Sequence, residues 1–208
     1  MVSLAVIALA EPVSHAHEPI VIASGHGSLS PNQPQAAIGD SGRIHVVFGI
    51  ADTVQYAGST NGNTFEKSRL AFQVPNMALG MRRGPRIAST GDVIVVTAIG
   101  GKIGKGRDGY ILAWQSADHG NTWLGPVRVN DTADSAREGL HAMASGPDGA
   151  VWCVWLDLRH KKSKIYAARS LDSGKTWKKN IRVYRSPDGS VCECCHPSIA
   201  VGGNGLAS

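Results

Sequence analysis

The octapeptide SLDSGKTW, Ser170–Trp177, decides the fold, and SADHGNTW, Ser116–Trp123, repeats its pattern. Both read S-x-D-x-G-x-T-W, so five positions of eight agree, and the copies begin 54 residues apart. A third copy, GSTNGNTF, places Gly62 in the glycine slot and Thr60 where the aspartate stands. Fixed spacing of this kind is typical of a chain built from structural repeats.

A second pattern recurs with the octapeptide: a short apolar segment, a glycine turn and an alternating segment, as in GPRIASTGDVIVVT and LHAMASGPDGAVWCVW. Its turn glycines are Gly42, Gly91, Gly149 and Gly205. Short strands and turns at regular spacing indicate β-propeller blades. We therefore predict an all-β fold, a β-propeller of four-stranded antiparallel blades, with about three and a half blades present. The predicted blades are 33–82, 83–138, 139–192 and the start of the next at 195–208.

The octapeptides resemble the Asp-boxes, or BNR repeats, of the sialidase (neuraminidase) superfamily, over about 33–208. The motif is specific for the fold and weak for activity, since many non-hydrolytic propellers carry it. The resemblance implies six blades, so we expect the remaining blades in a longer chain. It also implies an exo-α-sialidase type of glycoside hydrolase acting on anionic sugars. The alternatives are a non-catalytic propeller that binds glycans or protein partners, and a propeller with a thiolate metal site.

The octapeptide also predicts which face of the propeller holds the candidate functional site. Its aspartate, hydroxyl groups and glycine suit a tight turn between the third and fourth strands of a blade. The opposite face collects the loops between second and third strands and the crossovers between blades, and in sialidases that face holds the active site. The loops are about 50–54, 99–109 and 156–164, and the crossovers about 77–86, 131–141 and 186–197.

Two residues on that face resemble sialidase site residues. GPRIAS resembles the R-I-P motif, whose arginine binds the substrate carboxylate, although Ala88 replaces the proline; this implies substrate binding by Arg86. Asp108 follows 22 residues later in IGGKIGKGRDGYI, where the resemblance implies the catalytic acid/base. The alternatives are an arginine extended at the propeller rim and an Asp-Gly turn.

Further candidates stand in WLDLRHKKSK, where Asp157 and Arg159 resemble the D-x-R of sialidase-like blades and are predicted to bind substrate. The alternative is a solvated basic loop. Glu138 is a further carboxylate on the preceding crossover. In the family, the catalytic tyrosine, its partner glutamate and the remaining arginines come from later blades. We therefore expect the chain of residues 1–208 to be inactive by itself.

The stretch SVCECCHPS brings Cys192, Cys194, Cys195 and His196 together. Three thiols and an imidazole suit a soft metal such as Cu or Zn. Disulfides are the favoured interpretation in an exported protein, and Cys153 makes two bridges arithmetically feasible. No other cofactor is predicted.

The formal charge is +5, with a basic cluster between Arg82 and Arg107 and another over 161–179. No nucleic-acid motif or helical basic stripe accompanies it, so an anionic carbohydrate is the expected partner rather than nucleic acid. Residues 1–18 are a candidate signal peptide, which predicts a secreted or periplasmic protein; the alternative is a frayed N-terminal strand. Their apolar run is too short to span a membrane.

Overall fold

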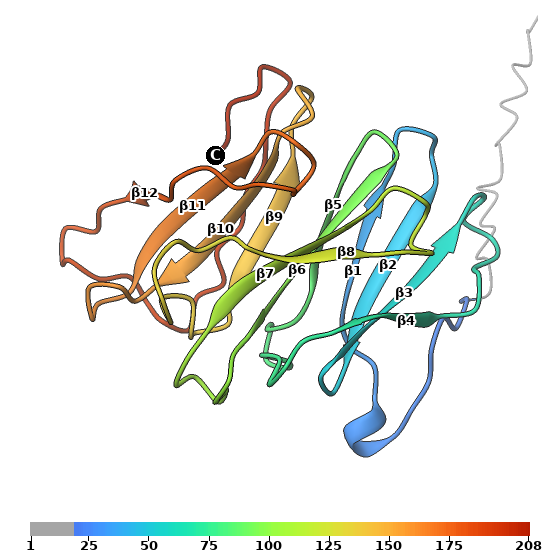
Figure 1. Cartoon of the computed structure of the whole chain (residues 1–208), viewed down its shortest axis with the longest axis horizontal. Helices are drawn as coiled ribbons and strands as arrows, with labels where there is room; N and C mark the ends of the chain where they lie inside the picture. The colour runs from blue at the N-terminus through green and yellow to red at the C-terminus, as the bar shows by residue number, and fades with distance from the viewer. Residues whose placement is uncertain (1–18) are drawn as a thin grey trace, which may run out of the picture.

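The computed structural model describes residues 19–208, so the candidate signal peptide at 1–18 lies outside the described residues. Three four-stranded antiparallel sheets follow one another along the chain, each in simple meander order (Figure 1). Sheet I holds β1 (Asn32–Ile38), β2 (Ile44–Ile50), β3 (Thr53–Ser59) and β4 (Arg69–Gln73). Sheet II holds β5 (Arg86–Thr90), β6 (Val93–Gly100), β7 (Tyr110–Ser116) and β8 (Leu124–Arg128). Sheet III holds β9 (His141–Ser145), β10 (Val151–Asp157), β11 (Lys164–Ser170) and β12 (Ile181–Tyr184). The predicted all-β class and the four-stranded antiparallel sheets are confirmed.

The remaining described structure is brief. A short 3-10 helix, Gly27–Leu29, precedes sheet I. After sheet III, Val201 and Ala207 form an isolated antiparallel bridge around a turn, and Ala200 and Ser208 exchange backbone hydrogen bonds. Within 19–208, no helix is long and apolar enough to cross a membrane.

The first strands of the three sheets approach one another: β1 contacts β5, β5 contacts β9, and β2 also contacts β5. Second strands are buried along most of their length, as in β6 and β10, whereas all four residues of the edge strand β12 are exposed. Strands covered on both faces are apolar at nearly every position rather than alternating. This explains the continuous runs VIVVTAI and VWCVW.

Apolar cores fill the space between neighbouring sheets. Between sheets I and II, Phe72 stacks on Trp114 with ring centroids 4.0 Å apart. Between sheets II and III, the fully buried Trp155 packs with Ile111 and Tyr166. Aromatic side chains of this size contribute most of the burial that holds one sheet against the next.

The octapeptide turns are closed by their own side chains. Asp118 accepts hydrogen bonds from Thr122 N at 2.8 Å and Thr122 Oγ1 at 2.6 Å, and Ser116 Oγ accepts one from Gly120 N at 2.8 Å. The second copy, Ser170–Trp177, repeats all three distances. These contacts satisfy backbone amides within the turn, so the motif is a structural element and not a reaction site.

The third copy differs by one residue from the alignment read off the sequence. Ser59 ends β3 as Ser116 ends β7, and its Oγ accepts from Gly62 N at 2.9 Å. Asn61 then takes the aspartate's place, because its Oδ1 accepts from Thr64 N at 2.9 Å. Thr60 therefore does not occupy the aspartate slot; this turn is one residue shorter, and the amide replaces the carboxylate.

The octapeptide glycine also sets the distance between sheets. Gly174 has a φ of 85°, and a Cβ built on it would lie 2.8 Å from Val95 Cγ1 of sheet II. We expect Gly174→Ala to lower the free energy of unfolding by about 2 kcal/mol, through the left-handed backbone and the overpacked contact. Thermal unfolding checks this, with a fall in Tm of roughly 4–8 °C.

Gly203 supplies the matched control, since among the described residues, its two chain neighbours aside, no heavy atom lies within 4 Å of a Cβ built there. Gly203→Ala is expected to leave Tm unchanged within error. Equal shifts for the two variants would show that the turn glycine does not govern the packing of sheet III on sheet II.

Candidate functional site

A cavity of about 380 Å³ opens where three connecting segments meet. The crossover from β4 to β5 contributes Met77, Leu79 and Arg83, the loop from β6 to β7 contributes Lys105, and the crossover from β8 to β9 contributes Arg137 and Glu138. These are the loops and crossovers of the face that the octapeptide turns point away from. The cavity therefore joins apolar walls to three cationic residues and one carboxylate.

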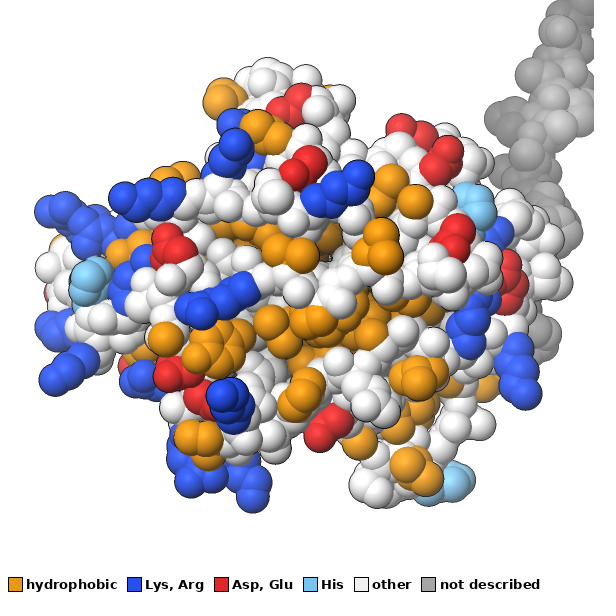
Figure 2. Space-filling model, in the orientation of Figure 1, with side chains coloured by type: hydrophobic (Ala, Val, Ile, Leu, Met, Phe, Trp, Pro, Cys, Tyr) orange, Lys and Arg blue, Asp and Glu red, His pale blue; other side chains and the backbone are white. Residues whose placement is uncertain are grey.

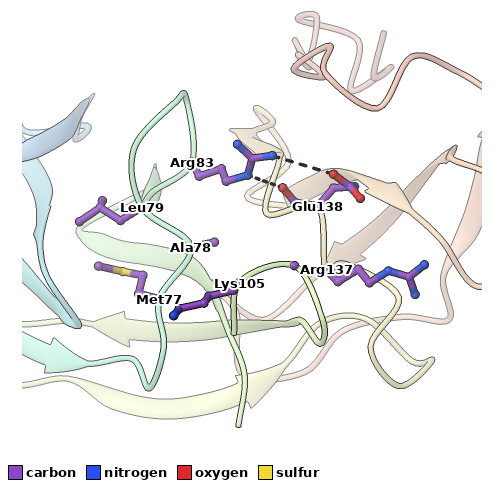
Figure 3. A pocket seen from close by; sticks show the side chains of 8 residues that line it. Met77, Ala78, Leu79, Arg83, Lys105, Arg137 and Glu138 are labelled. Atoms are coloured by element: carbon purple, nitrogen blue, oxygen red, sulfur yellow. Dashed lines mark hydrogen bonds and ion pairs between the residues drawn. The ribbon is translucent and has the colours of Figure 1, made fainter. Parts of the chain in front are cut away.

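Arg83 and Glu138 face each other across one side of this cavity, and Arg137 is directed away from the pair (Figure 3). Arg83 Nε donates to the Glu138 backbone oxygen at 2.6 Å, and the Arg83 guanidinium lies 3.9 Å from the Glu138 carboxylate. Both side chains remain partly exposed. Gly139 makes room for this contact, because a Cβ there would lie 2.9 Å from Arg83 Cδ.

Asp108 shapes the loop that carries Lys105. Its carboxylate accepts three backbone hydrogen bonds, from Lys102 N at 2.7 Å, Ile103 N at 2.9 Å and Gly104 N at 2.6 Å. These bonds, that from Ile103 foremost, hold the pKa of the Asp108 carboxyl below its usual value. A general acid needs the opposite shift. The geometry thus favours a loop-structuring role over the catalytic role inferred from the resemblance.

Arg86 is buried at the start of β5, with 5% of its surface exposed. Its Nε donates to the backbone oxygen of His141 at 2.9 Å, and one terminal nitrogen donates to the oxygens of Pro85 at 2.9 Å and Gly84 at 3.4 Å. The other donates to the oxygen of Arg82 and to His196 Nε2, the latter at 2.7 Å. All five N–H groups of the guanidinium are thereby used inside the protein. The geometry favours a structural role, in which Arg86 connects sheet II to sheet III and to the segment that follows sheet III, over contact with a substrate carboxylate.

Arg159 and Asp157 are likewise paired within the fold. Arg159 donates from Nε to one Asp157 oxygen at 2.8 Å and from a terminal nitrogen to the other at 2.9 Å. It also donates to Asp131 at 2.9 Å, and its guanidinium lies 4.0 Å from the Tyr166 ring centroid. Asp157 is fully buried and accepts from Trp155 Nε1. The geometry favours a structural pair on sheet III over the predicted substrate contact.

The cysteines divide into two environments. Cys153 is fully buried on β10, and burial raises the pKa of its thiol far above the usual value. Cys192, Cys194 and Cys195 are exposed, and all four are free thiols in this structure. The hydrogen bond with Cys194 lowers the pKa of the Cys192 thiol and raises that of Cys194 to about 11.

His196, the fourth member of that sequence cluster, does not join the thiols, because its imidazole is hydrogen bonded to Arg86. Its Nε2 accepts from Arg86, and burial, followed by the charge of Arg86, lowers the pKa of the imidazole. The three sulfur atoms form a group without it.

No motif indicates Arg83 or Lys105 as cavity residues, and the only signal for them in the sequence is the basic cluster between Arg82 and Arg107.

The second basic stretch, 161–179, does not line this cavity. Figure 2 shows Lys and Arg side chains gathered around the end of the molecule that carries β11 and β12. Lys161 and Lys178 of that stretch are exposed to solvent, and Lys164 is half-buried.

No family model matches the sequence, and no curated protein matches it. Solved structures do resemble the fold. The Hadza microbial sialidase Hz136 superposes with a TM-score of 0.52 at 18% identity, over 71% of this chain and 36% of that one. A protein of unknown function from Dyadobacter fermentans superposes with a TM-score of 0.61 at 17% sequence identity, over 90% of this chain and 63% of that one. A variant of the NanB sialidase from Streptococcus pneumoniae superposes with a TM-score of 0.55 at 16% sequence identity, over 82% of this chain and 25% of that one.

The chain spans less than two thirds of each of these structures. At such identities the likeness shows the fold alone: the sheets are arranged as in propeller glycosidases. A shared fold hosts several functions, so function has to be argued from the cavity and its side chains.

Proposed function

We propose that this chain is part of a sialidase-type propeller glycosidase and that the cavity around Arg83 and Lys105 binds an anionic carbohydrate. The observation that carries the proposal is the composition of that cavity. It places cationic groups next to a carboxylate and to the apolar side chains of Met77 and Leu79. A sugar acid offers the matching surface: a carboxylate for the cations, hydroxyl groups for Glu138, and apolar ring C–H groups for the wall.

Binding is better supported by this chain than bond cleavage. Glycoside hydrolysis generally needs two carboxyl groups, or a nucleophile with a separate acid. Glu138 is the one carboxylate lining the cavity within the described residues, and Asp108 is held by backbone amides. In this proposal the described residues bind the acidic sugar, and groups from further blades complete a propeller of six and perform hydrolysis. A non-catalytic glycan-binding propeller is the second candidate, favoured by the engagement of Asp108.

The proposal includes export to the periplasm or the medium, for which the apolar residues near the N-terminus are the support. Fractionation of cells that produce the full-length protein tests this part separately. Recovery in the cytoplasmic fraction with residues 1–18 intact would contradict it.

Sugar binding is tested by titrating the chain calorimetrically with N-acetylneuraminic acid and with a neutral galactoside. We expect the acid to bind and the galactoside to bind at least tenfold more weakly. Lys105→Gln and Arg83→Gln should each weaken binding of the acid by about tenfold, since a hydrogen bond to a charged group contributes about 1.5–3 kcal/mol.

Lys102→Gln is the matched control, because Lys102 lies exposed in the same loop and the substitution removes the same charge without altering the cavity lining. It should leave the dissociation constant unchanged within twofold at moderate salt. An equal loss from Lys102→Gln would mean that net charge and not the cavity drives binding. If the acid binds but full-length protein releases nothing from a fluorogenic sialoside, the non-catalytic propeller is the function.

A further inference from the structure

Three thiols converge in the segment that follows sheet III. The Sγ atoms of Cys192, Cys194 and Cys195 all lie within 4.8 Å of one another, and those of Cys192 and Cys194 are 2.7 Å apart. A turn produces this convergence, because Cys195 N donates to the backbone oxygen of Cys192 at 3.4 Å. The three side chains are exposed, so an ion from solution has access to them.

The spacing suits a single thiophilic ion. With metal–sulfur bonds of about 2.3 Å, sulfur atoms around one ion lie about 4 Å apart, which side-chain rotations reach from the observed separations. We propose that Cys192, Cys194 and Cys195 bind one Cu(I) ion as three thiolates. None of the three ligands lines the cavity assigned to the acidic sugar.

The ligand set favours Cu(I) over Zn(II). A closed structural zinc site takes four protein ligands, usually cysteines and histidines. The described residues bring three sulfurs together, and His196 Nε2 is committed to Arg86. Thiolates suit both Cu(I) and Zn(II), so the ligand count decides: three sulfurs are one short of the four protein ligands of a closed zinc site.

Neighbouring charge supports the same assignment. Arg82, Arg83 and Cys194 line a second cavity of about 350 Å³. Binding converts three thiols and Cu(I) into a complex of one positive and three negative charges, releases three protons and changes no oxidation state. Two net negative charges result, and the arginine side chains that line a cavity with Cys194 supply positive charge on that side of the cluster.

A disulfide between two of the three thiols is the competing state. It would leave one thiol over, because the fourth cysteine, Cys153, is fully buried on β10. The predicted pair of disulfides would require Cys153 to leave the core between sheets II and III. Three free thiols together thus fit an ion better than they fit a set of bridges.

The test is titration of the reduced full chain with Cu(I) under anaerobic conditions, in competition with a chromogenic Cu(I) chelator. We expect one Cu(I) per chain, and an X-ray absorption spectrum with sulfur as the only neighbour. Changing Cys192, Cys194 or Cys195 singly to serine should weaken Cu(I) binding on the order of 100-fold or more, since even substitutions beside a metal ligand cost 10–100-fold.

Two variants serve as controls, with circular dichroism to confirm folding. Cys153→Ala removes a thiol outside the cluster, and His196→Gln removes the imidazole; neither should change the Cu(I) affinity. Loss of affinity in His196→Gln would overturn the three-thiolate ligand set. Failure to retain Cu(I) against the chelator, or equal affinity for Zn(II) at the same thiols, would overturn the assignment to Cu(I). A reduced chain that forms a stable disulfide in place of binding the ion would overturn it as well.

Discussion

Arg86→Ala is expected to lower the free energy of unfolding by about 4 kcal/mol, a loss typical of breaking a buried polar network. The guanidinium is the shared donor for the backbone oxygens of Gly84, Pro85 and His141. Alanine supplies no donor and no volume, so these buried carbonyls lose their partner and a void opens between β5 and β9. Urea unfolding followed by fluorescence measures the change as a lower midpoint at an unchanged slope.

Two further variants make this result specific. Arg107→Ala removes an exposed arginine of the same basic cluster and should change stability by less than about 0.5 kcal/mol. Arg86→Lys should fall between wild type and alanine, because one ammonium group cannot reach all the acceptors. If Arg86→Ala keeps its stability but loses binding of acidic sugars, Arg86 is the carboxylate contact implied by the sialidase resemblance and not the structural tie.

Lowering the pH from 6.5 to 5 is expected to reduce the free energy of unfolding by up to about 4 kcal/mol, at about 1.4 kcal/mol per pH unit for each of two histidines. Burial lowers the pKa of His45 to about 4, and burial lowers that of His141 well below 6.5. Both imidazoles are hydrogen bonded inside the fold, His45 to Tyr56 at 2.8 Å and His141 to Thr97 at 2.9 Å.

The sign follows from which state takes up protons. Below the unfolded value of 6.5, the unfolded chain binds protons at both histidines while the folded chain does not. Stability is therefore complete above pH 6.5 and falls as the pH drops towards about 4, the folded pKa of His45. The pKa of His196 is lowered too and adds to the effect in the same direction.

Chemical unfolding at several pH values between 6.5 and 5 checks this prediction. His45→Gln and His141→Gln should each flatten the dependence by about 1.4 kcal/mol per pH unit. His26→Gln, at an exposed position, should leave it unchanged. A free energy of unfolding that stays constant across this range in the wild-type chain would show that neither histidine is held neutral by the fold.

Much of the fold could be predicted because its signals are local. The turn Ser170–Trp177 closes through bonds between residues no more than four positions apart, and its serine, aspartate, glycine and threonine each have a conformational reason to be there. The same locality explains the one misplaced alignment. The turn after β3 lacks a residue, and only the common end of the strands shows that Asn61 takes the place of Thr60.

The site was less predictable, because its side chains are defined by distant partners. In the sequence, Arg86 follows a glycine and a proline and looks available to bind a ligand. In the structure, its hydrogen-bond acceptors include His141 and His196, which are 55 and 110 residues away. Arg83 shows no motif, yet its contact with Glu138 spans 55 residues and forms one side of the cavity. Sequence spacing placed these residues on one face, but it contains no information on which of them are already paired.

The sequence by itself determined the strand pattern, the turn chemistry and the grouping of Cys192, Cys194 and Cys195, because all three depend on neighbours along the chain. Only the tertiary structure decided which polar groups remain available to a ligand. Packing sheet against sheet uses the hydrogen-bonding capacity of Arg86, Asp157 and Arg159 inside the fold. It leaves Lys105 at the cavity and the three thiols exposed. Availability depends on burial and on contacts made across the whole chain, which no local pattern encodes.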